Sequence, residues 1–304
     1  RVESRDRKCV LLSGNEPQFT VQIVADTFNK AGKNSKDGAN KMAYSVINIL
    51  EKNGETYTDE FPISLENGRY SYIFDQKISE FKSKNGIPSN YNAKKSFYYV
   101  VDSMIQSGLL SLADRNMDPL KLQAKVNKLG YYPPVLVNSW TFTQQKNKED
   151  WLKGYGLKDG VSALLAFKHI RNNYYKIDSS MTDKEARKIM LVRDLLKSKI
   201  YTQYNPVTIS KGIKKETVVQ IEENSMKLSG VSVAIEQKRV YPLGNLAAHV
   251  LGYVGKIPSS KAEDLVKEGY SPQDMIGLSG IENSYENKLR GKDGYKEVKV
   301  DSVG

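Results

Sequence analysis

The chain has 304 residues, of which 39% are hydrophobic and 27% charged, and its net charge is +11 at pH 7. This length leaves room for two domains with buried cores, and the composition is that of a globular protein. No run of eighteen apolar residues occurs, which excludes a membrane-spanning helix within these residues. Cys9 is the single cysteine, and His169 and His249 are the two histidines. An intrachain disulfide is therefore excluded, and we expect no metal site and no cofactor.

The N-terminal part of the chain predicts a strand followed by a helix. Apolar and polar residues alternate over 18–24, a pattern typical of a half-buried strand. Apolar residues then recur with helical spacing from Ala39 to Leu50. Ser35 could cap this helix, and Gly54 could end it.

A hairpin and several helices are predicted next. Asn67-Gly68 separates the β-prone segments 61–65 and 70–74, which is a strong hairpin signal. Helical spacing follows over 93–107, 119–129 and 161–172. These segments together predict a mostly helical lobe with a hairpin.

The C-terminal part predicts a mixture of helices and strands. Helices are expected over 184–200, 217–224, 246–251, 259–268 and 280–289. Strands are expected over 231–236, leading into Arg239, and over 295–303. The predicted fold class is therefore α+β.

Three motifs lie close to the C-terminus. They are Arg239-Val240-Tyr241-Pro242-Leu243-Gly244, the segment from Ala247 to Gly255, and the segment from Ile276 to Glu282. Tyr285-Glu286 and Leu289-Arg290-Gly291 follow. The whole stretch closely resembles the N-terminal, non-penicillin-binding module of class B penicillin-binding proteins. The residues that carry this resemblance are Arg239, Tyr241, Pro242, Gly244, His249, Gly252, Gly255, Gly277, Gly280, Glu282, Tyr285 and Gly291.

The N-terminus fits the opening pattern of the same family, Arg-Gly-x-Ile-x-Asp-Arg-Asn-Gly-x-x-Leu-Ala. Arg1, Asp6 and Arg7 match it in register, and Arg5 lies among them. The departures are Val2, Ser4, Lys8, Cys9 and Ser13. Val2 and Cys9 stand where the pattern has glycine, so either the backbone is strained there or the turn is built differently.

The resemblance covers roughly 1–25 and 188–304 and implies a domain plan. It implies a pedestal with a small mixed sheet and short helices, interrupted by an inserted, mostly helical head lobe. The expected boundaries are 1–27 for the first pedestal segment, 28–185 for the head, and 186–304 for the second pedestal segment. A membrane anchor is expected before Arg1 and a transpeptidase domain after Gly304.

The motif residues are interpreted as structural rather than as ligand contacts. Arg239 and Glu282 are predicted to form an ion pair inside the pedestal, because a guanidinium and a carboxylate can hold two remote segments in register. Asp6, with Arg5 or Arg7, could join this network. Tyr241, Pro242 and Gly244 are expected to shape a turn. The glycines at 252, 255, 277 and 280 are expected at turns or close contacts, and His249 is expected to be a hydrogen-bonded structural residue.

The catalytic signatures of the family are absent. Lys-Thr-Gly and Lys-Ser-Gly do not occur, and the single Ser-x-x-Lys is Ser79-Glu80-Phe81-Lys82. Ser83-Lys84-Asn85 follows too closely to form a separate wall of a catalytic cleft. A self-contained serine acyl-enzyme that uses Ser79 and Lys82 remains an alternative, but a solvated helix end is favoured.

Positive charge gathers in residues 183–215. This segment contains nine Lys or Arg and three acidic residues. The basic residues are Lys184, Arg187, Lys188, Arg193, Lys197, Lys199, Lys211, Lys214 and Lys215. Such a stripe could bind nucleic acid or an anionic cell surface, and both remain alternatives. A solvated helix face is favoured, and no nucleic-acid partner is expected.

The family resemblance implies a function in bacterial cell wall synthesis. The chain would be the non-catalytic pedestal and head of a peptidoglycan D,D-transpeptidase on the extracytoplasmic face of the cell membrane. It would position the catalytic domain and contact a membrane glycosyltransferase of the shape, elongation, division and sporulation (SEDS) type, among other wall-synthesis proteins. The large head favours the elongation branch.

Overall fold

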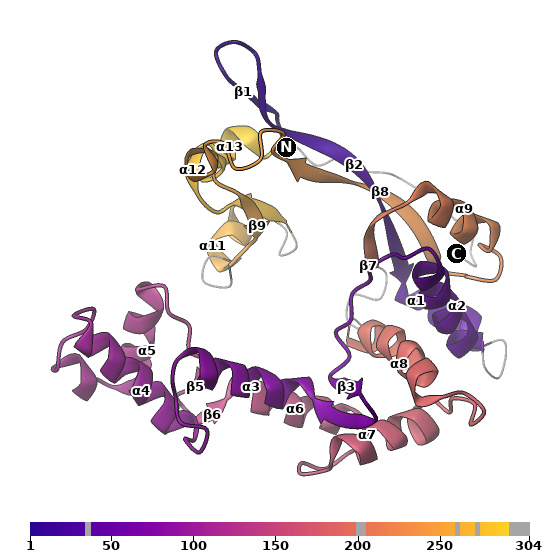
Figure 1. Ribbon diagram of the computed structural model, residues 1–304, viewed down its shortest axis with the longest axis horizontal. Coiled ribbons are helices and arrows are strands. Elements are labelled where there is room, and N and C mark those ends of the chain that lie inside the picture. The colour runs from indigo at the N-terminus through magenta and orange to yellow at the C-terminus, as the bar shows by residue number, and fades with distance from the viewer. Residues whose placement is uncertain (34–37, 199–204, 259–261, 271–273, 292–304) are drawn as a thin grey trace. The chain divides into compact units, whose positions relative to one another are not determined.

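The computed structural model describes residues 1–33, 38–198, 205–258, 262–270 and 274–291. The predicted α+β class is confirmed, because short helices and small sheets are mixed along the chain (Figure 1). None of the helices in the described ranges is long and apolar enough to span a bilayer. The predicted cap at Ser35 and the predicted strand over 295–303 lie outside the described residues.

The chain divides into two compact units. One comprises residues 1–22, 210–219 and 232–304, and the other comprises 23–209 and 220–231. We call the first the pedestal unit and the second the head unit.

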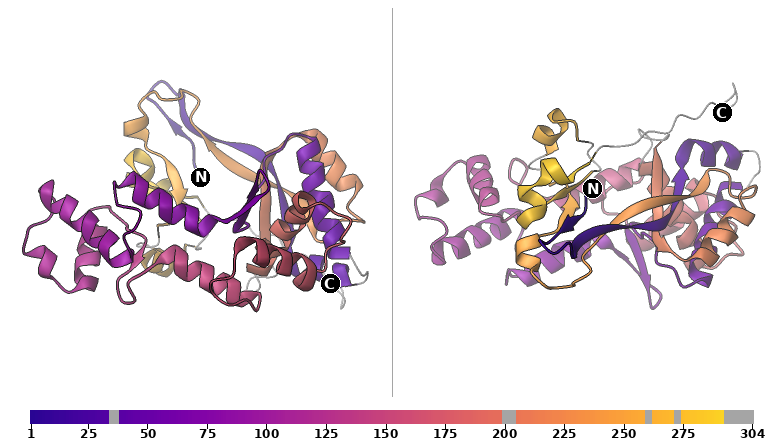
Figure 2. Two further views of the ribbon diagram at one scale, coloured as in Figure 1. Left: turned by 60° about the horizontal axis from the view of Figure 1, so that its bottom comes forward. Right: turned by 90° about the horizontal axis from the view of Figure 1, so that it is seen from above.

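The pedestal unit is built on a four-stranded sheet. β1 (Ser4–Arg5) pairs with β2 (Leu11–Val24), and the sheet order is β1-β2-β7, with β8 also paired to β2. β7 spans Pro206–Ile213 and β8 spans Val231–Val240. The two views of Figure 2 show β2 and β8 running side by side. The strand predicted over 18–24 is confirmed, but it begins at Leu11, because pairing along the sheet extends a segment whose polar residues hide it in the sequence.

Short helices and strands follow β8 in the pedestal unit. They are α10 (Ala248–Leu251), β9 (Val254–Lys256), α11 (Ala262–Lys267), β10 (Met275–Gly277), α12 (Gly280–Ser284) and α13 (Glu286–Leu289). β9 and β10 pair antiparallel. Gly252 and Gly280 have positive φ, and a Cβ atom on Gly252 would lie 1.9 Å from the carbonyl oxygen of Ser279. The prediction of close backbone contact at these two glycines is confirmed.

The head unit contains two helices that pack on each other. α2 (Gly38–Lys52) buries Val46, Ile47 and Leu50, and α8 (Asp183–Ser198) packs against it. Both helices were predicted from apolar spacing. α1 (Ala25–Lys33) was not predicted, and it follows β2 directly. α9 (Lys215–Glu223) confirms the helix predicted over 217–224.

A structural repeat fills most of the head unit. The first copy consists of β3 (Ile63–Glu66), β4 (Arg69–Tyr72), α3 (Ile73–Lys84) and α4 (Ala93–Gln106). The second copy consists of β5 (Val135–Leu136), β6 (Thr141–Phe142), α6 (Thr143–Gly154), and α7 (Ala163–His169), which continues into the π-helical turn η2 (Ile170–Tyr174). A 3-10 turn η1 (Asp114–Asn116) and α5 (Pro119–Lys128) follow the first copy, and α8 follows the second.

Equivalent residues in the two copies are 70 positions apart. α3 and α6 begin at Ile73 and Thr143, and α4 and α7 begin at Ala93 and Ala163. The caps correspond as well, since Asn92 and Ser162 each accept a hydrogen bond from a backbone N–H three residues later. Phe97 and Phe167 are both fully buried. The two copies therefore share one local design.

Aromatic side chains of one copy pack on aromatic side chains of the other. Phe81 of α3 packs on Phe142, and Trp151 of α6 packs on Tyr72, each with ring centroids 6.5 Å apart. α3 and α6 lie side by side (Figure 1). Residues 73–74, which were predicted to be strand, begin α3 instead. Neither α3 nor α6 was predicted, because α3 has no fully buried residue and α6 has only Leu152, so the apolar spacing is weak.

Candidate functional site

An ion pair between Arg239 and Glu282 lies inside the pedestal unit. Arg239 stands near the end of β8 and Glu282 on α12. The Nη2 and Nε atoms of Arg239 lie 2.7 and 2.8 Å from Oε1 of Glu282. The two side chains are only 7% and 2% exposed. The predicted pair is thus confirmed, and it joins segments that are 43 residues apart.

Arg1 completes a four-residue cluster of two arginines and two glutamates. Its Nη2 atom lies 3.0 Å from Oε2 of Glu282 and 2.7 Å from Oε2 of Glu286. Glu282 therefore lies between two guanidinium groups. Glu286 also accepts a hydrogen bond of 2.7 Å from the backbone N–H of Gly277. We call Arg1, Arg239, Glu282 and Glu286 the pedestal cluster.

Contacts within the pedestal cluster shift the pKa values of Arg1 and Glu286. Burial alone would lower the pKa of Arg1, but its hydrogen bonds and charge interactions with Glu286 and Glu282 raise it. Burial alone would raise the pKa of Glu286, but hydrogen bonds from Arg1 and from the N–H of Gly277 hold it below its usual value. Both groups are therefore stabilised in their charged forms.

Backbone and neutral side chains make further hydrogen bonds with the cluster, although the buried Nε atom of Arg1 has no hydrogen-bond partner among the described residues. Arg239 donates to the carbonyl oxygen of Val2 at 2.7 Å and to Oγ of Ser13 at 2.8 Å. Asn15 donates to the carbonyl oxygen of Arg1 at 2.6 Å. Ser13 stands where the family pattern has alanine, and its hydroxyl accepts a bond from Arg239. This departure from the pattern therefore adds a contact to the cluster.

Arg5, Asp6 and Arg7 take no part in this network within the described residues, so that prediction is wrong. Oδ1 of Asp6 accepts the backbone N–H groups of Lys8 and Val10 at 2.8 Å each, which is a local turn contact. Arg5 pairs with Glu3 and donates to the carbonyl of Cys9, and Arg7 is exposed. The short side chain of Asp6 accepts hydrogen bonds from the turn that it forms and therefore does not reach the pedestal cluster.

Cys9 has a φ of 62°, in the left-handed region. The strain expected where cysteine replaces glycine is therefore present. Val2 has no such conformation. The turn keeps its glycine-like shape at residue 9 even though the residue has a side chain.

For the other motif residues, some predictions are confirmed and one is wrong. The turn at Tyr241 is confirmed, since the N–H of Gly244 donates to the carbonyl of Tyr241 at 2.9 Å. His249 is exposed and makes no hydrogen bond in the described part of the chain, so its predicted hydrogen-bonded role is wrong. His249 lies on an exposed side of α10, where no described residue forms a hydrogen bond with its ring. Tyr285 is likewise exposed.

Sequence reasoning missed the roles of Ser13, Asn15 and Glu286. Glu286 lies four residues after Glu282, which would place both carboxylates on one face of a continuous helix and could have indicated a shared partner. Nothing in the sequence points to Ser13 or Asn15, because each of them contacts Arg239, which is more than two hundred residues away.

A cavity of about 510 Å³ lies beside the pedestal cluster. Arg1, Arg239, Tyr241, Tyr253, Tyr270 and Arg290 contribute to its lining. The guanidinium group of Arg290 stacks on the Tyr270 ring at 3.7 Å. The charged groups of the cluster are occupied by one another, which suits a structural clamp better than acid–base chemistry.

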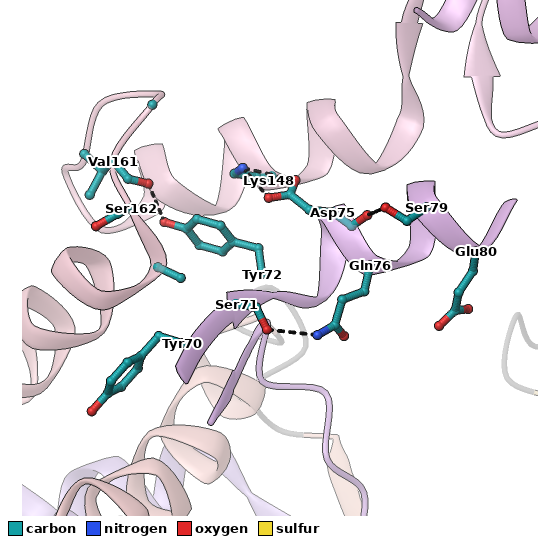
Figure 3. Close-up of a pocket in the computed structure, with 12 residues that line it drawn as sticks. Tyr70, Ser71, Tyr72, Asp75, Gln76, Ser79, Glu80, Lys148, Val161 and Ser162 are labelled. Carbon is teal, nitrogen blue, oxygen red and sulfur yellow. Dashed lines mark hydrogen bonds and ion pairs between the residues drawn. The ribbon is translucent and has the colours of Figure 1, made fainter. Parts of the chain in front are cut away.

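Ser79 lines a second cavity, of about 770 Å³, in the head unit (Figure 3). Its hydroxyl donates to the backbone carbonyl of Asp75 at 3.0 Å, and Lys148 is paired with the Asp75 carboxylate at 2.9 Å. Lys82 donates to the carbonyl of Ser89 at 2.7 Å. Among these residues, all of which the structure describes, no base contacts the Ser79 hydroxyl. This geometry does not activate a nucleophile.

The basic segment is solvated in part, since Lys184, Lys211, Lys214 and Lys215 are exposed, whereas other basic side chains of the segment are only partly exposed and have acidic partners. Arg187 pairs with Asp59 at 2.6 Å, and Lys188 pairs with Glu51 at 2.5 Å. Lys211 pairs with Glu236 at 2.8 Å. α8 packs against α2 and against η2 of the second copy of the repeat, which brings several of its charged side chains close to partners. Lys199 lies outside the described residues.

Known proteins resemble this chain in sequence. The peptidoglycan D,D-transpeptidase MrdA of Salmonella typhimurium (strain SL1344) is 40% identical over 107 residues, which are 34% of this chain and 17% of the relative. Penicillin-binding protein 3 of Bacillus subtilis (strain 168) is 32% identical over 114 residues, 36% of this chain and 17% of the relative. The match thus spans 17% of the length of these relatives.

Solved structures resemble the chain more distantly. Penicillin-binding protein 2B of Streptococcus pneumoniae (strain 5204) has a TM-score of 0.41 and 16% identity, covering 95% of this chain and 33% of that one. A complex between penicillin-binding protein PBP2 and MreC from Helicobacter pylori has a TM-score of 0.36 and 16% identity, covering 100% and 30%.

A family model confirms the resemblance carried by the motifs. The model of the penicillin-binding protein dimerisation domain matches residues 1–304, the whole length of the chain. The residues of the pedestal cluster fall within this match. The chain therefore belongs to the penicillin-binding protein dimerisation domain family.

Proposed function

We propose that the chain is the non-catalytic pedestal and head of a class B penicillin-binding protein, and that it positions a D,D-transpeptidase domain for peptidoglycan cross-linking. The pedestal cluster is the observation that supports this proposal. It ties the first residues of the chain to helices near its end, through side chains that are nearly all buried. Such a clamp fixes geometry and leaves no group free for catalysis.

The second part of the proposal concerns partners and location. We propose contact with a SEDS-type glycosyltransferase at the extracytoplasmic face of the membrane, in the elongation branch. Several relatives with 33 to 40% identity are named MrdA, a peptidoglycan D,D-transpeptidase, which supports a role in wall synthesis. By holding the pedestal unit in one conformation, the pedestal cluster would give a wall-synthesis partner a rigid surface to bind.

Labelling with a fluorescent penicillin tests the absence of catalysis in these residues. The chain should remain unlabelled, and Ser79→Ala should leave this result unchanged. Covalent labelling that Ser79→Ala abolishes would overturn the proposal in favour of a self-contained acyl-enzyme. The contacts of Ser79 argue against that result, since its hydroxyl is bonded to a backbone carbonyl.

Co-purification from membranes tests the partner. A tagged protein should retain a SEDS-type glycosyltransferase, and Arg239→Ala should reduce the retained amount because it loosens the pedestal unit. Arg5→Ala is a matched control, since Arg5 forms an exposed pair with Glu3. Equal retention by all three proteins would show that the pedestal cluster does not support the contact.

A further inference from the structure

A group of charged and aromatic side chains lies within the head unit, where α8 meets the second copy of the repeat. Tyr155 and Trp151 both donate hydrogen bonds to Oδ1 of Asp194, the latter at 2.9 Å. The hydroxyl groups of Tyr155 and Tyr175 lie 2.8 Å apart. Burial raises the pKa of Asp194, although the bonds from Tyr155 and Trp151 oppose this effect. The carboxylate is thus held in place by aromatic donors.

Two cations flank this group without a carboxylate at ion-pair distance in the described part of the chain. Arg193 donates from Nη1 to the side-chain oxygen of Asn40 at 3.0 Å, and its guanidinium group lies 5.0 Å from the centre of the Tyr175 ring. Lys197 donates to the carbonyl of Gly154 at 2.8 Å and lies 4.1 Å from the centre of the Tyr155 ring. Both contacts leave donor hydrogens of the two cations unused.

Arg193 and Lys197 line the same small cavity. Its volume is about 160 Å³, and Asn29, Tyr174, Ala25 and Leu196 complete much of its wall. Burial lowers the pKa of Arg193 and that of Lys197, and for Lys197 the nearby charge of Asp194 partly offsets this effect. Partly desolvated cations are costly unless an anion compensates them.

The repeat provides an internal control for this cluster. The positions 70 residues before Tyr155, Tyr174 and Tyr175 are occupied by Asn85, Met104 and Ile105. The helix that follows the first copy, α5, buries only Leu122 and Val126. The same local fold is therefore built without the aromatic and cationic group, so the group is not a requirement of the fold.

We propose that the cavity between Arg193 and Lys197 binds a single carboxylate group of a small ligand or a chain terminus. With Asp194 ionised, the three charged residues sum to one positive charge, which matches a monoanion better than a phosphate dianion. A guanidinium edge and an ammonium group can each donate to a carboxylate oxygen. Ala25 and Leu196 supply an apolar wall for a short aliphatic body such as an alanine side chain.

Isothermal titration calorimetry with N-acetyl-alanine tests the site. Saturable binding is expected for the free carboxylate and not for N-acetyl-alaninamide, which lacks the charge. The D and L forms distinguish the two sources of such a group, since wall stem peptides end in D-alanine and ordinary proteins in L residues. Either preference supports a carboxylate site, whereas equal binding of the amide or tighter binding of inorganic phosphate would overturn it.

Three variants locate the site. Arg193→Gln and Lys197→Gln should each weaken binding by about tenfold or more, as expected when a charge-assisted hydrogen bond is lost. Lys121→Gln, an exposed lysine on α5, removes the same charge elsewhere and should leave affinity unchanged. Undiminished binding by both cavity variants would refute the proposal.

A second readout covers the case in which a variant folds poorly. Trp151 contacts both Asp194 and Tyr155, and the chain has only one other tryptophan, Trp140. In a Trp140→Phe background, N-acetyl-alanine should change the fluorescence of Trp151 with the same midpoint as the calorimetry. The ligand should also raise the melting temperature of the unsubstituted protein. No fluorescence change and no thermal shift would count against the site.

Discussion

The two units hold remote parts of the chain together by different means. In the pedestal unit, Arg1 and Arg239 reach Glu282 and Glu286 through buried ion pairs. In the head unit, the first copy of the repeat closes on an apolar cluster that includes Phe97, Leu122 and Val126. The stability that an ion pair contributes depends on its geometry and on the presence of both partners. The stability of an apolar cluster depends on how completely side chains fill its volume. The units should therefore respond differently to mutation.

The largest effect is expected from Arg239→Ala. It leaves Glu282 with one guanidinium partner, Arg1, instead of two and removes bonds to Ser13 and Val2, so the free energy of unfolding of the pedestal unit should fall by about 3–5 kcal/mol. Chemical denaturation followed by circular dichroism measures it. Arg5→Ala should cost less than about 1 kcal/mol, because its pair with Glu3 is exposed. Equal effects of the two substitutions would contradict the role of the cluster.

The second prediction concerns the apolar head. Leu122→Ala should destabilise the head unit by about 3 kcal/mol, since Leu122 is fully buried and a cavity would remain. Leu120→Ala on the same helix should change stability by less than about 0.5 kcal/mol, since Leu120 is 58% exposed. Thermal unfolding of both variants checks the difference. Similar losses would mean that α5 does not pack as described.

The third prediction uses pH. The pKa of Glu286 is below its usual value of 4.5, so its contribution to stability is present above that value and is lost as the pH falls through the lowered pKa. Glu286→Gln should therefore cost about 2 kcal/mol at pH 7 and progressively less in acid. Denaturation curves at a series of pH values measure this change. Glu3→Gln, a control in an exposed pair, should show little dependence on pH.

The smallest effect should be a gain in stability. Cys9 adopts a φ of 62°, so Cys9→Gly should stabilise the pedestal unit by about 1 kcal/mol, because glycine adopts this conformation without strain. Val2→Gly introduces the other glycine of the family pattern and should give no such gain, since Val2 is not in the left-handed region. Comparison of the two melting temperatures distinguishes them, and a loss of stability in Cys9→Gly would show that the cysteine side chain makes a compensating contact.

The sequence predicted much of the fold where one short-range signal was strong. The hairpin at Asn67-Gly68 and α4, α5 and α8 were found because turn residues or apolar spacing marked them. α3 and α6 were missed because they are only partly buried and their apolar positions are sparse. The repeat was missed as well, since few residue identities survive between the copies and the shared features are caps, glycines and buried aromatic positions.

The sequence alone determined the family and the pairing of Arg239 with Glu282, because both are written in contiguous motifs with fixed residue types. Only the tertiary structure decided that Arg1 and Glu286 join this pair, that Asp6 does not, and that Arg187 and Lys188 of α8 pair with acidic residues of remote segments. Such contacts depend on which distant segments meet, and each segment carries no local record of its partner.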